Sequence, residues 1–336
     1  MSADITPRVE LPLLLRYEVI DAVPWPGTLA RLCLVSKLCR YAAESRLYRS
    51  FILVGHYTND FCFTLDCVSP FFRLPSLTTF QVHACGGMDE FHHPVGVSSV
   101  TDIDLMCSIL EAQEISLLIG VCKALRSFRF QYGCVTIWPD IEAEIEHLDL
   151  VAIGTALRHH KHSLEVLRID DMDNEYIRNS PPSGAIGSLK DFEKLVSLDL
   201  EQHYLLGPVE VGSGREPETS DSSGNGAEPV NGQTINANQQ IRLLDLLPPS
   251  LEALVLRDCD VTIVPQLCDI YARGSRQLPN LKRIGIDGTI CPHPEHAEMV
   301  DGRYTRYDTD SAEFLSAMCV LQLVFGEAGI ELNSDE

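Results

Sequence analysis

Cysteine and histidine, the side chains that most often bind zinc, stand close together at three places in the sequence. The densest group is Cys291, His293 and His296, in the segment CPHPEH. Zinc needs three or four ligands that converge at about 2.0–2.3 Å, but the prolines here favour an extended loop and no second Cys or His pair follows at zinc-finger spacing. The histidines within 92–93 and 159–162 fall in a predicted loop and at a predicted helix end, where they complement the helix dipole. We therefore expect none of these groups to hold a metal.

Motifs that carry nucleophilic or nucleotide chemistry do not occur in the sequence. There is no G-x-S-x-G nucleophile elbow, and Gly212-Ser213-Gly214 lies in a segment that cannot hold a nucleophile rigidly. No phosphate-binding glycine loop follows a predicted strand. Asp170 and Asp171 are adjacent in a predicted strand, where neighbouring side chains point to opposite faces, so they do not form an acid–base pair. The sequence thus predicts a protein that is not an enzyme and carries no cofactor.

A short apolar pattern recurs seven times: an apolar residue, two others, an apolar residue, one other, and a third apolar residue. The copies begin at Leu77, Val100, Leu125, Leu164, Leu195, Leu251 and Leu281. The last two apolar positions are two residues apart, which is the period of a strand. Between copies, residues 104–121, 145–158 and 263–272 have apolar residues at helical spacing. This alternation predicts an α/β fold, an irregular leucine-rich-repeat solenoid with a parallel sheet on its concave side and helices outside.

Composition divides the chain into segments. Residues 207–240 contain 17 Gly, Pro, Ser or Asn among 34 residues and neither an aromatic residue nor a leucine, so they predict a disordered loop. The expected segments are a flexible N-terminus (1–9), a helical module (10–53), the first part of the solenoid (54–206), the disordered insertion (207–240), the second part of the solenoid (241–330) and a flexible tail (331–336).

Charge and composition exclude several classes of protein. The formal net charge is −22, whereas a general nucleic-acid binder needs a basic surface, so no nucleic-acid partner is expected. No run of 18 apolar residues occurs, which argues against a membrane partner or span. The first residues lack the pattern of a secretory signal, and the twelve cysteines follow no disulfide framework. We therefore expect reduced thiols and a cytoplasmic or nuclear protein.

The N-terminal part differs from the rest in charge and in apolar content. Residues 1–55 contain seven Lys or Arg against five Asp or Glu, whereas the remainder contains 19 against 43. Within the predicted helix 29–43, 11 of 15 side chains are apolar or small. A surface helix needs only one apolar stripe, so this helix must be covered on two sides. A partner protein or the next domain should supply that cover.

Residues 10–53 resemble an F-box. The resemblance lies in the opening Leu11-Pro12, an apolar helix through Leu15, Val19 and Ile20, the segment Leu29-x-x-Leu32-x-Leu34-Val35-Ser36-Lys37, and the closing Leu47-Tyr48-Arg49-Ser50. An F-box followed by leucine-rich repeats implies a substrate-recognition subunit of a Skp–cullin–F-box ubiquitin ligase, whose repeats hold a protein substrate. The resemblance implies that a Skp-type adaptor is bound by Leu11, Pro12, Leu15, Val19, Leu29, Leu32, Leu34 and Val35.

Two other functions stay open. One is a leucine-rich-repeat scaffold for protein interactions without a link to a ubiquitin ligase, in which 10–53 is only a helical cap on the first repeat. The other is a zinc enzyme built on the Cys and His groups. Binding of the Skp adaptor separates the first two functions, and metal analysis of the purified protein separates the third.

The concave sheet is the expected substrate site, because its side chains project at fixed spacing from a rigid backbone. The charged residues expected there are Asp102, Asp104, Arg129, Arg168, Asp199 and Arg283. The acidic excess beyond residue 55 should steer a basic protein partner toward this surface.

Overall fold

The described residues form two compact units. The computed structural model of the chain describes residues 48–54, 65–88, 91–133, 148–171, 183–207, 241–259, 262–287, 299–300, 303–304 and 312–335. Unit 1 comprises Met1–His147 and Ala156–Pro181, and unit 2 comprises Leu148–Thr155 and Pro182–Glu336. Each unit is described below by itself.

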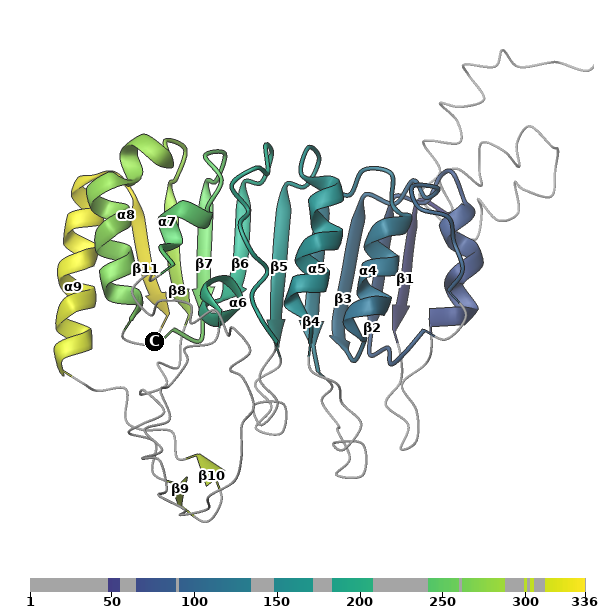
Figure 1. Cartoon of the computed structure of the whole chain (residues 1–336), viewed down its shortest axis with the longest axis horizontal. Coiled ribbons are helices and arrows are strands. Elements are labelled where there is room, and N and C mark those ends of the chain that lie inside the picture. Colours follow the sequence, from purple (N-terminus) through teal and green to yellow (C-terminus); the bar gives the residue numbers. More distant parts are fainter. Residues whose placement is uncertain are drawn as a thin grey trace, which may run out of the picture. The chain divides into compact units, whose positions relative to one another are not determined.

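Unit 1 contains five parallel strands that pair in the order in which they occur in the chain. They are β1 (Ser50–Val54), β2 (Thr79–His83), β3 (Asp102–Ser108), β4 (Ser127–Tyr132) and β5 (Val166–Asp171). The helices within this unit are η1 (Leu65–Arg73), α4 (Ala112–Val121) and η3 (Arg158–His160). Figure 1 shows α4 lying along one face of the strands.

Unit 2 contains four parallel strands, β6 (Ser197–Glu201), β7 (Ala253–Arg257), β8 (Arg283–Asp287) and β11 (Glu331–Asp335), paired in that order. Its helices are α6 (Gln202–Leu206), α7 (Leu243–Leu246), α8 (Ile263–Gln277) and α9 (Ala312–Glu327), and β9 (Met299–Val300) and β10 (Arg303–Tyr304) form a separate antiparallel pair. Helix α5 (Leu150–Leu157) crosses the division between the units. Strands β2 to β8 coincide with the seven predicted segments, and within each unit they are parallel, as predicted.

The three apolar positions of every repeat are buried, and they form the core of each unit. In unit 1, Phe80, Ile103, Phe128 and Leu167 lie side by side in register across β2 to β5. Parallel strands of a sheet with one covered face alternate between core and open positions, which is the pattern seen in β2, iBiBi from Thr79 to His83. Burial of this row in adjacent strands is what makes each repeat depend on its neighbours.

Shared carbonyl groups connect neighbouring repeats where their strands begin. The Thr78 carbonyl accepts the N–H groups of Thr101 and Asp102, with N···O distances of 2.8 and 3.0 Å. The Thr101 carbonyl accepts those of Arg126 and Ser127 in the same way, at 2.7 and 3.0 Å. A slip of one residue would break both bonds and turn the apolar residues to the other face, so these contacts fix the register. The same arrangement recurs at the carbonyl groups of Arg49, Arg126, Val196 and Glu252.

A Leu-Pro turn leads into several of the strands. The Leu77 N–H donates to the Leu74 carbonyl at 3.2 Å, and the Leu281 N–H donates to the Leu278 carbonyl at the same distance. In both turns a proline occupies the second position, where its fixed φ suits a tight turn. The recurring Leu-Pro pair in the sequence therefore marks the turn that positions the first buried leucine of a repeat.

Several boundaries differ from those expected from the sequence. Residues 50–53, assigned to the helical module, form β1 together with residue 54 and pair with β2. Residues 331–335, expected to belong to a flexible tail, form β11 and pair with β8. Both are edge strands, which bury fewer side chains and so carry a weaker apolar pattern. The helix expected over 104–121 starts only at Ala112, because residues 102–108 form β3. The predicted insertion 207–240 lies outside the described residues beyond Gly207.

The core row predicts a large loss of stability when one of its leucines is truncated. Leu167 is fully buried beside Phe128, so Leu167→Ala should lower the free energy of unfolding by about 2–5 kcal/mol through lost burial and the cavity left behind. Leu323→Ala on α9 is the matched control, because Leu323 is exposed and its truncation should have little effect. Chemical denaturation of the full chain measures both values, and equal small losses would contradict the assigned core.

Candidate protein-binding face

The open face of unit 1 is the side of its sheet formed by residues that alternate with the buried ones. Its rows follow from the strand register: Gln81 lies beside Asp104, Asp104 beside Arg129, and Arg129 beside Arg168. Neighbouring strands are about 4.8 Å apart, so this row places four polar side chains within reach of one extended ligand. The open face consists of Ile52, Thr79, Gln81, His83, Asp102, Asp104, Met106, Arg129, Gln131, Val166, Arg168 and Asp170.

A groove of about 330 Å³ crosses this face over β3, β4 and β5, and charged side chains of both signs line it. Arg168 pairs with Asp170 at 2.9 Å, and Arg129 lies 4.0 Å from Asp104. The Asp170 side chain is only 6% exposed, and its Oδ1 has no hydrogen-bond donor among the described residues. A buried carboxylate oxygen without a donor is unfavourable, so a ligand that brings an N–H or O–H group to this oxygen would gain a strong hydrogen bond.

Asp104 has a perturbed acidity. Burial raises the pKa of Asp104 above its usual value, and the positive charges of Arg129 and Arg168 partly offset that effect. The carboxylate has therefore lost some hydration but keeps favourable neighbours. Because water screens such a group less than a fully exposed one, its charge acts strongly on a ligand in the groove.

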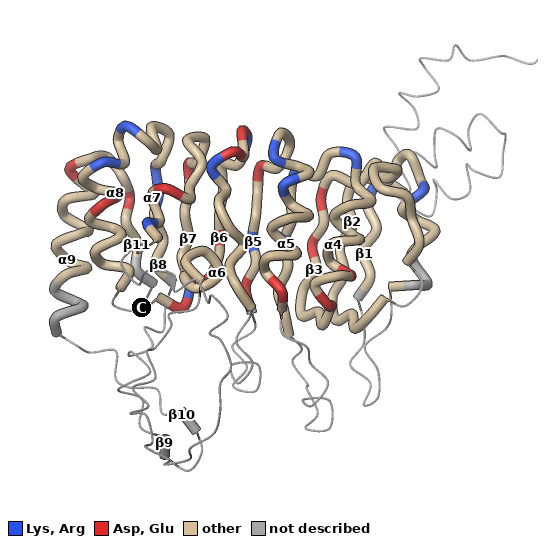
Figure 2. The backbone as a smooth tube through the Cα atoms, viewed as in Figure 1, with Lys and Arg blue, Asp and Glu red and all other residues tan. Residues whose placement is uncertain are grey.

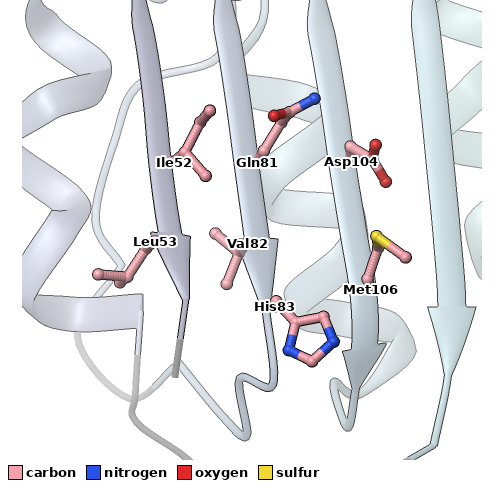
Figure 3. Close-up of a pocket in the computed structure, with 7 residues that line it drawn as sticks. All are labelled: Ile52, Leu53, Gln81, Val82, His83, Asp104 and Met106. Atoms are coloured by element: carbon pink, nitrogen blue, oxygen red, sulfur yellow. The ribbon is translucent and has the colours of Figure 1, made fainter. Parts of the chain in front are cut away.

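An apolar hollow adjoins the charged groove. It has a volume of about 280 Å³ and is lined by Ile52, Leu53, Gln81, Val82, His83, Asp104 and Met106. Figure 3 shows Ile52, Gln81 and Asp104 side by side on adjacent strands, with Met106 below Asp104. Ile52 is 63% exposed and Met106 is 47% exposed, which leaves apolar area available to a partner. Asp104 and Met106 line both depressions, so the hollow and the groove form one continuous surface.

A bulge in β3 presents Met106 to solvent. The pairing of β3 with β4 shifts between Leu105 and Ser108, and Cys107 has a positive φ of 49°. Both Cys107 and Ser108 are buried, whereas the preceding Met106 stays on the open face. The Met106 carbonyl is held by the N–H of Ala84 at 2.9 Å and by the Ser108 hydroxyl, also at 2.9 Å. Bulges re-aim side chains next to binding sites, and this one shapes the shared wall of the two depressions.

On the corresponding face of unit 2, an acidic and a basic side chain neutralise each other more completely. Arg257 donates to both carboxylate oxygens of Asp199, at 2.6 and 3.1 Å. Arg283 is exposed on β8, and β7 lies between this strand and β6, which carries Asp199. Of the six charged residues expected at the substrate site, the structure therefore brings Asp104, Arg129 and Arg168 into one groove. It places Asp102 on the next row of the same face, and Asp199 and Arg283 on the other unit.

The apolar part of the site was not predicted from the sequence. Ile52 was placed in the helical module, and Met106 in a helix, so neither was expected on the sheet. A signal for β1 exists: Tyr48, Phe51 and Leu53 repeat the spacing of the seven copies with an aromatic first position. Asp170 was considered only as a catalytic acid, and Arg257 not at all, because both lie beyond the third apolar position of their repeats.

Basic residues also gather away from this face. Figure 2 shows Lys and Arg concentrated in each unit along the edge where the strands begin. Some pair with the neighbouring repeat, as in Arg126 with Glu165 at 2.8 Å and Lys282 with Glu252 at 2.6 Å. Such exposed pairs contribute little free energy, so this edge is a solvated rim and not the core of a binding site.

Most of the residues proposed for adaptor or zinc binding are not among the described residues. The eight candidate adaptor-binding residues, Leu11 to Val35, lie outside the described residues, as do Cys291, His293 and His296. Of the six cysteines whose state is described, Cys268 and Cys319 are exposed, and the other four, Cys85, Cys107, Cys122 and Cys259, are buried. Burial raises the pKa of the Cys122 thiol to about 12, so it stays protonated and unreactive near neutral pH.

The comparison with known families agrees with the repeated strands. The pattern of the leucine-rich repeat domain matches residues 45–222, more than half of the chain. The chain belongs to the leucine-rich repeat family. The match begins before β1, which agrees with the place of that strand in the sheet of this leucine-rich repeat protein. No curated protein matches the sequence. Among the helices of the described residues, none has the length and apolar character needed to cross a membrane.

His160, one of the histidines considered as a zinc ligand, instead joins two repeats of unit 1. Its Nδ1 accepts the Leu125 N–H at 3.2 Å, and its Nε2 lies 3.0 Å from the Ile119 carbonyl oxygen. The two contacts require a neutral ring with the proton on Nε2. Burial lowers the pKa of His160, the hydrogen bond to Ile119 opposes this shift, and the charge of His159 adds to it.

The lowered pKa predicts an acid-sensitive contact. The pKa of His160 is lower in the folded protein than the ordinary value of 6.5, so the unfolded chain takes up a proton at this histidine first as the pH falls. The stabilisation that the His160 contact provides is therefore complete above pH 6.5 and is lost as the pH falls toward the folded-state pKa. His160→Ala should lower the free energy of unfolding by about 1–3 kcal/mol at neutral pH, because the Leu125 N–H loses its acceptor. Urea unfolding between about pH 7.5 and 5 measures the effect, with the exposed His92→Ala as the control. The same pH slope in wild type and His160→Ala would contradict it.

Proposed function

We propose that this leucine-rich repeat protein is a protein-recognition subunit whose open face of unit 1 binds a segment of a partner protein. The observation that carries the proposal is the continuous surface formed by the hollow at Ile52 and Met106 and the groove at Asp104 and Asp170. Apolar anchors provide most of the binding energy in protein interfaces, and adjacent charged groups provide specificity and orientation. The surface offers both within one rigid sheet.

The chemistry of the groove favours a partner segment that combines an apolar side chain with hydrogen-bond donors. The apolar side chain would fill the hollow between Ile52 and Met106. A lysine, arginine or backbone N–H would reach the unsatisfied oxygen of Asp170. The acidic excess of the chain supports the same choice, because it attracts basic partners over distances longer than a contact.

We further propose that the protein is the substrate-recognition subunit of a Skp–cullin–F-box ubiquitin ligase. The support is the F-box-like sequence of residues 10–53, together with a leucine-rich repeat domain whose match begins at residue 45, near the end of that segment. Residues 50–53, the last of the F-box-like segment, belong to β1. In the alternative, the repeats act as an interaction scaffold without a ligase, and the N-terminal helices only cover the first repeat.

A change of the apolar anchor should abolish partner binding and leave the fold intact. Ile52→Asp places a charge in the hollow, and the exposed position of Ile52 means that folding should be unaffected. Partner affinity should fall at least about tenfold. The double variant Arg129→Glu with Arg168→Glu should weaken the same partner through the groove.

The measurement is quantitative affinity purification followed by binding assays with the partners recovered. Leu323→Asp on α9 is the matched control, because it introduces the same charge at an exposed apolar residue elsewhere. A photo-crosslinking residue at position 106 should label the same partner. Raising salt from about 50 to 500 mM should slow association with a basic partner. Partners that bind equally well to wild type and to the Ile52 and arginine variants would exclude this face.

Adaptor binding tests the ligase function separately. Replacing Leu11-Pro12 by Ala-Ala, or Val35 by Asp, should abolish co-purification with a Skp-type adaptor, because both changes remove apolar contacts expected in the interface. Ile52→Asp is the cross-control: it should leave adaptor binding unchanged, and the Leu11-Pro12 variant should retain the partner of the open face. A wild-type chain that does not bind the adaptor would favour the scaffold, without bearing on the open face.

A further inference from the structure

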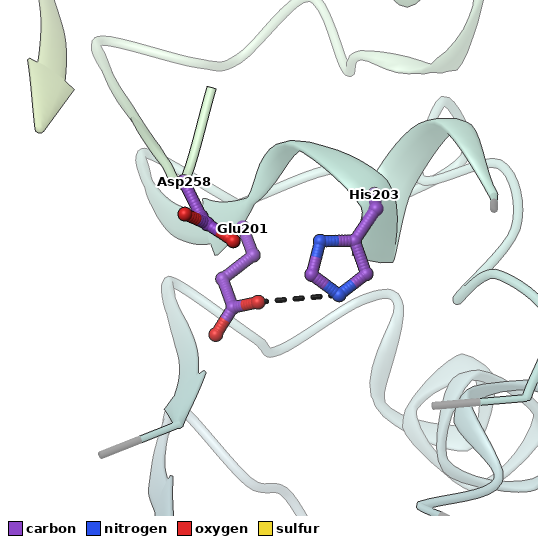
Figure 4. A group of neighbouring side chains, drawn as sticks. All are labelled: Glu201, His203 and Asp258. Atoms are coloured by element: carbon purple, nitrogen blue, oxygen red, sulfur yellow. Dashed lines mark ion pairs between the residues drawn. The ribbon is translucent and has the colours of Figure 1, made fainter. Parts of the chain in front are cut away.

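Three metal-binding side chain types converge in unit 2, although the sequence places them up to 57 residues apart. They are Glu201, His203 and Asp258, whose potential ligand atoms all lie within 4.8 Å of one another. Figure 4 shows the Glu201 and Asp258 carboxylates and the His203 imidazole gathered around one position. We propose that this cluster binds a divalent transition-metal ion of the zinc class.

The fold explains why these residues meet. Glu201 is the last residue of β6, and His203 lies in α6, which follows it directly. Register pairs Glu201 with Arg257, the last residue of β7, so Asp258 leaves β7 next to the end of β6. Two consecutive repeats therefore supply the ligands. A bound ion would connect the C-terminal ends of β6 and β7, whereas the shared carbonyl groups connect neighbouring strands where they begin.

The distances suit a small ion. His203 Nε2 lies 3.2 Å from Glu201 Oε2. Two ligand atoms that are each about 2.0–2.2 Å from a tetrahedral zinc lie about 3.4 Å apart, so this pair already has the separation that zinc requires. Asp258 lies within 4.8 Å of the other two, so reaching a separation of about 3.4 Å requires an approach of at most about 1.4 Å. Its backbone has a φ of 45°, which Asp and Asn tolerate better than most residues.

The electrostatics of the cluster favour a cation. The Glu201 side chain is only 4% exposed, and a second carboxylate, Asp258, lies beside it. Glu201 is buried and Asp258 is half-buried, and neighbouring carboxylates that are shielded from water repel each other unless a positive charge lies between them. The guanidinium of Arg257, nearby in sequence, is engaged by both oxygens of Asp199. A protonated His203 can supply one positive charge, whereas a divalent ion supplies two and binds all three groups.

Neighbouring contacts hold the ligands in place. Gln202, which separates Glu201 from His203 in the sequence, is buried, and its Nε2 donates to the Thr262 hydroxyl at 2.9 Å. This bond connects α6 to the segment after Asp258. The Tyr204 ring packs edge-on against the His203 ring, with centroids 4.7 Å apart. Such outer contacts orient metal ligands and raise affinity.

The ligand set selects the kind of metal. One imidazole and two carboxylates suit zinc and related transition ions, whereas calcium and magnesium prefer oxygen ligands alone. The set contains no sulfur. Three protein ligands leave further coordination positions for water. The site differs from the Cys291, His293 and His296 group, which is the densest of the Cys and His groups in the sequence and which is not expected to bind metal.

The test uses the full chain with Cys291, His293 and His296 all changed to Ala, so that this second group cannot bind the probe. Titration with zinc chloride, followed by isothermal calorimetry and metal analysis after dialysis, should give one zinc per chain. Zinc should also raise the melting temperature, because it binds the folded state. X-ray absorption should show nitrogen and oxygen ligands only.

Three conservative variants locate the ion. Glu201→Gln, His203→Asn and Asp258→Asn should each lower zinc affinity at least about tenfold, as expected for loss of a ligand, and should abolish the rise in melting temperature. The exposed His159→Ala is the control and should bind like the parent. Circular dichroism checks that each variant is folded; if Glu201→Gln is not, His203→Asn and the absorption spectrum decide. No bound zinc in the parent, unchanged affinity in the folded variants, or a sulfur ligand would each overturn the proposal.

Discussion

The fold of each unit depends on the requirement that the described strands of its parallel sheet share their core with their neighbours. A single repeat offers three apolar side chains on one side of a strand, and it cannot bury them alone. Stacking in parallel buries them, provided that equivalent positions lie side by side. The shared carbonyl groups enforce this alignment, since each accepts two N–H groups from the following repeat, as Thr78 does from Thr101 and Asp102. Register and core are thus two results of one constraint.

The same constraint creates the open face. Once the apolar positions are aligned, the residues between them are also aligned, and Gln81, Asp104, Arg129 and Arg168 form a row without having any role in the core. Substitution in such a row changes what the surface binds more than it changes stability, which is the property that suits repeat proteins to recognition. An irregularity in β3 then shapes this face, because the bulge after Leu105 directs Met106 outward, where it lines the apolar hollow.

The two units use their charged residues differently. In unit 1, an oxygen of Asp170 and the partly desolvated Asp104 still have capacity for a ligand. In unit 2, Arg257 neutralises Asp199 through two hydrogen bonds, and the acidic side chains at the ends of β6 and β7 instead gather around His203. Open-face recognition is therefore expected of unit 1, and ion binding of unit 2.

The sequence by itself determined the class of fold. Its seven-fold apolar pattern located β2 to β8 and their buried residues, because burial in a stacked repeat depends only on spacing along the chain. It also identified which charged residues stand between the apolar ones. It did not find the edge strands β1 and β11, since an edge strand satisfies its backbone on one side and needs fewer apolar residues.

Only the tertiary structure decided which residues meet. Ile52 and Met106 lie 54 positions apart, and Glu201 and Asp258 lie 57 apart, so no local pattern connects them. Their proximity results from strand pairing, because β1 and β3 both pair with β2, and because Asp258 directly follows Arg257, the register partner of Glu201. The role of His160 was hidden for the same reason, because its two backbone partners, Leu125 and Ile119, lie 35 and 41 residues away along the chain. Spacing within a repeat is encoded locally, whereas contacts between repeats exist only after the repeats have stacked.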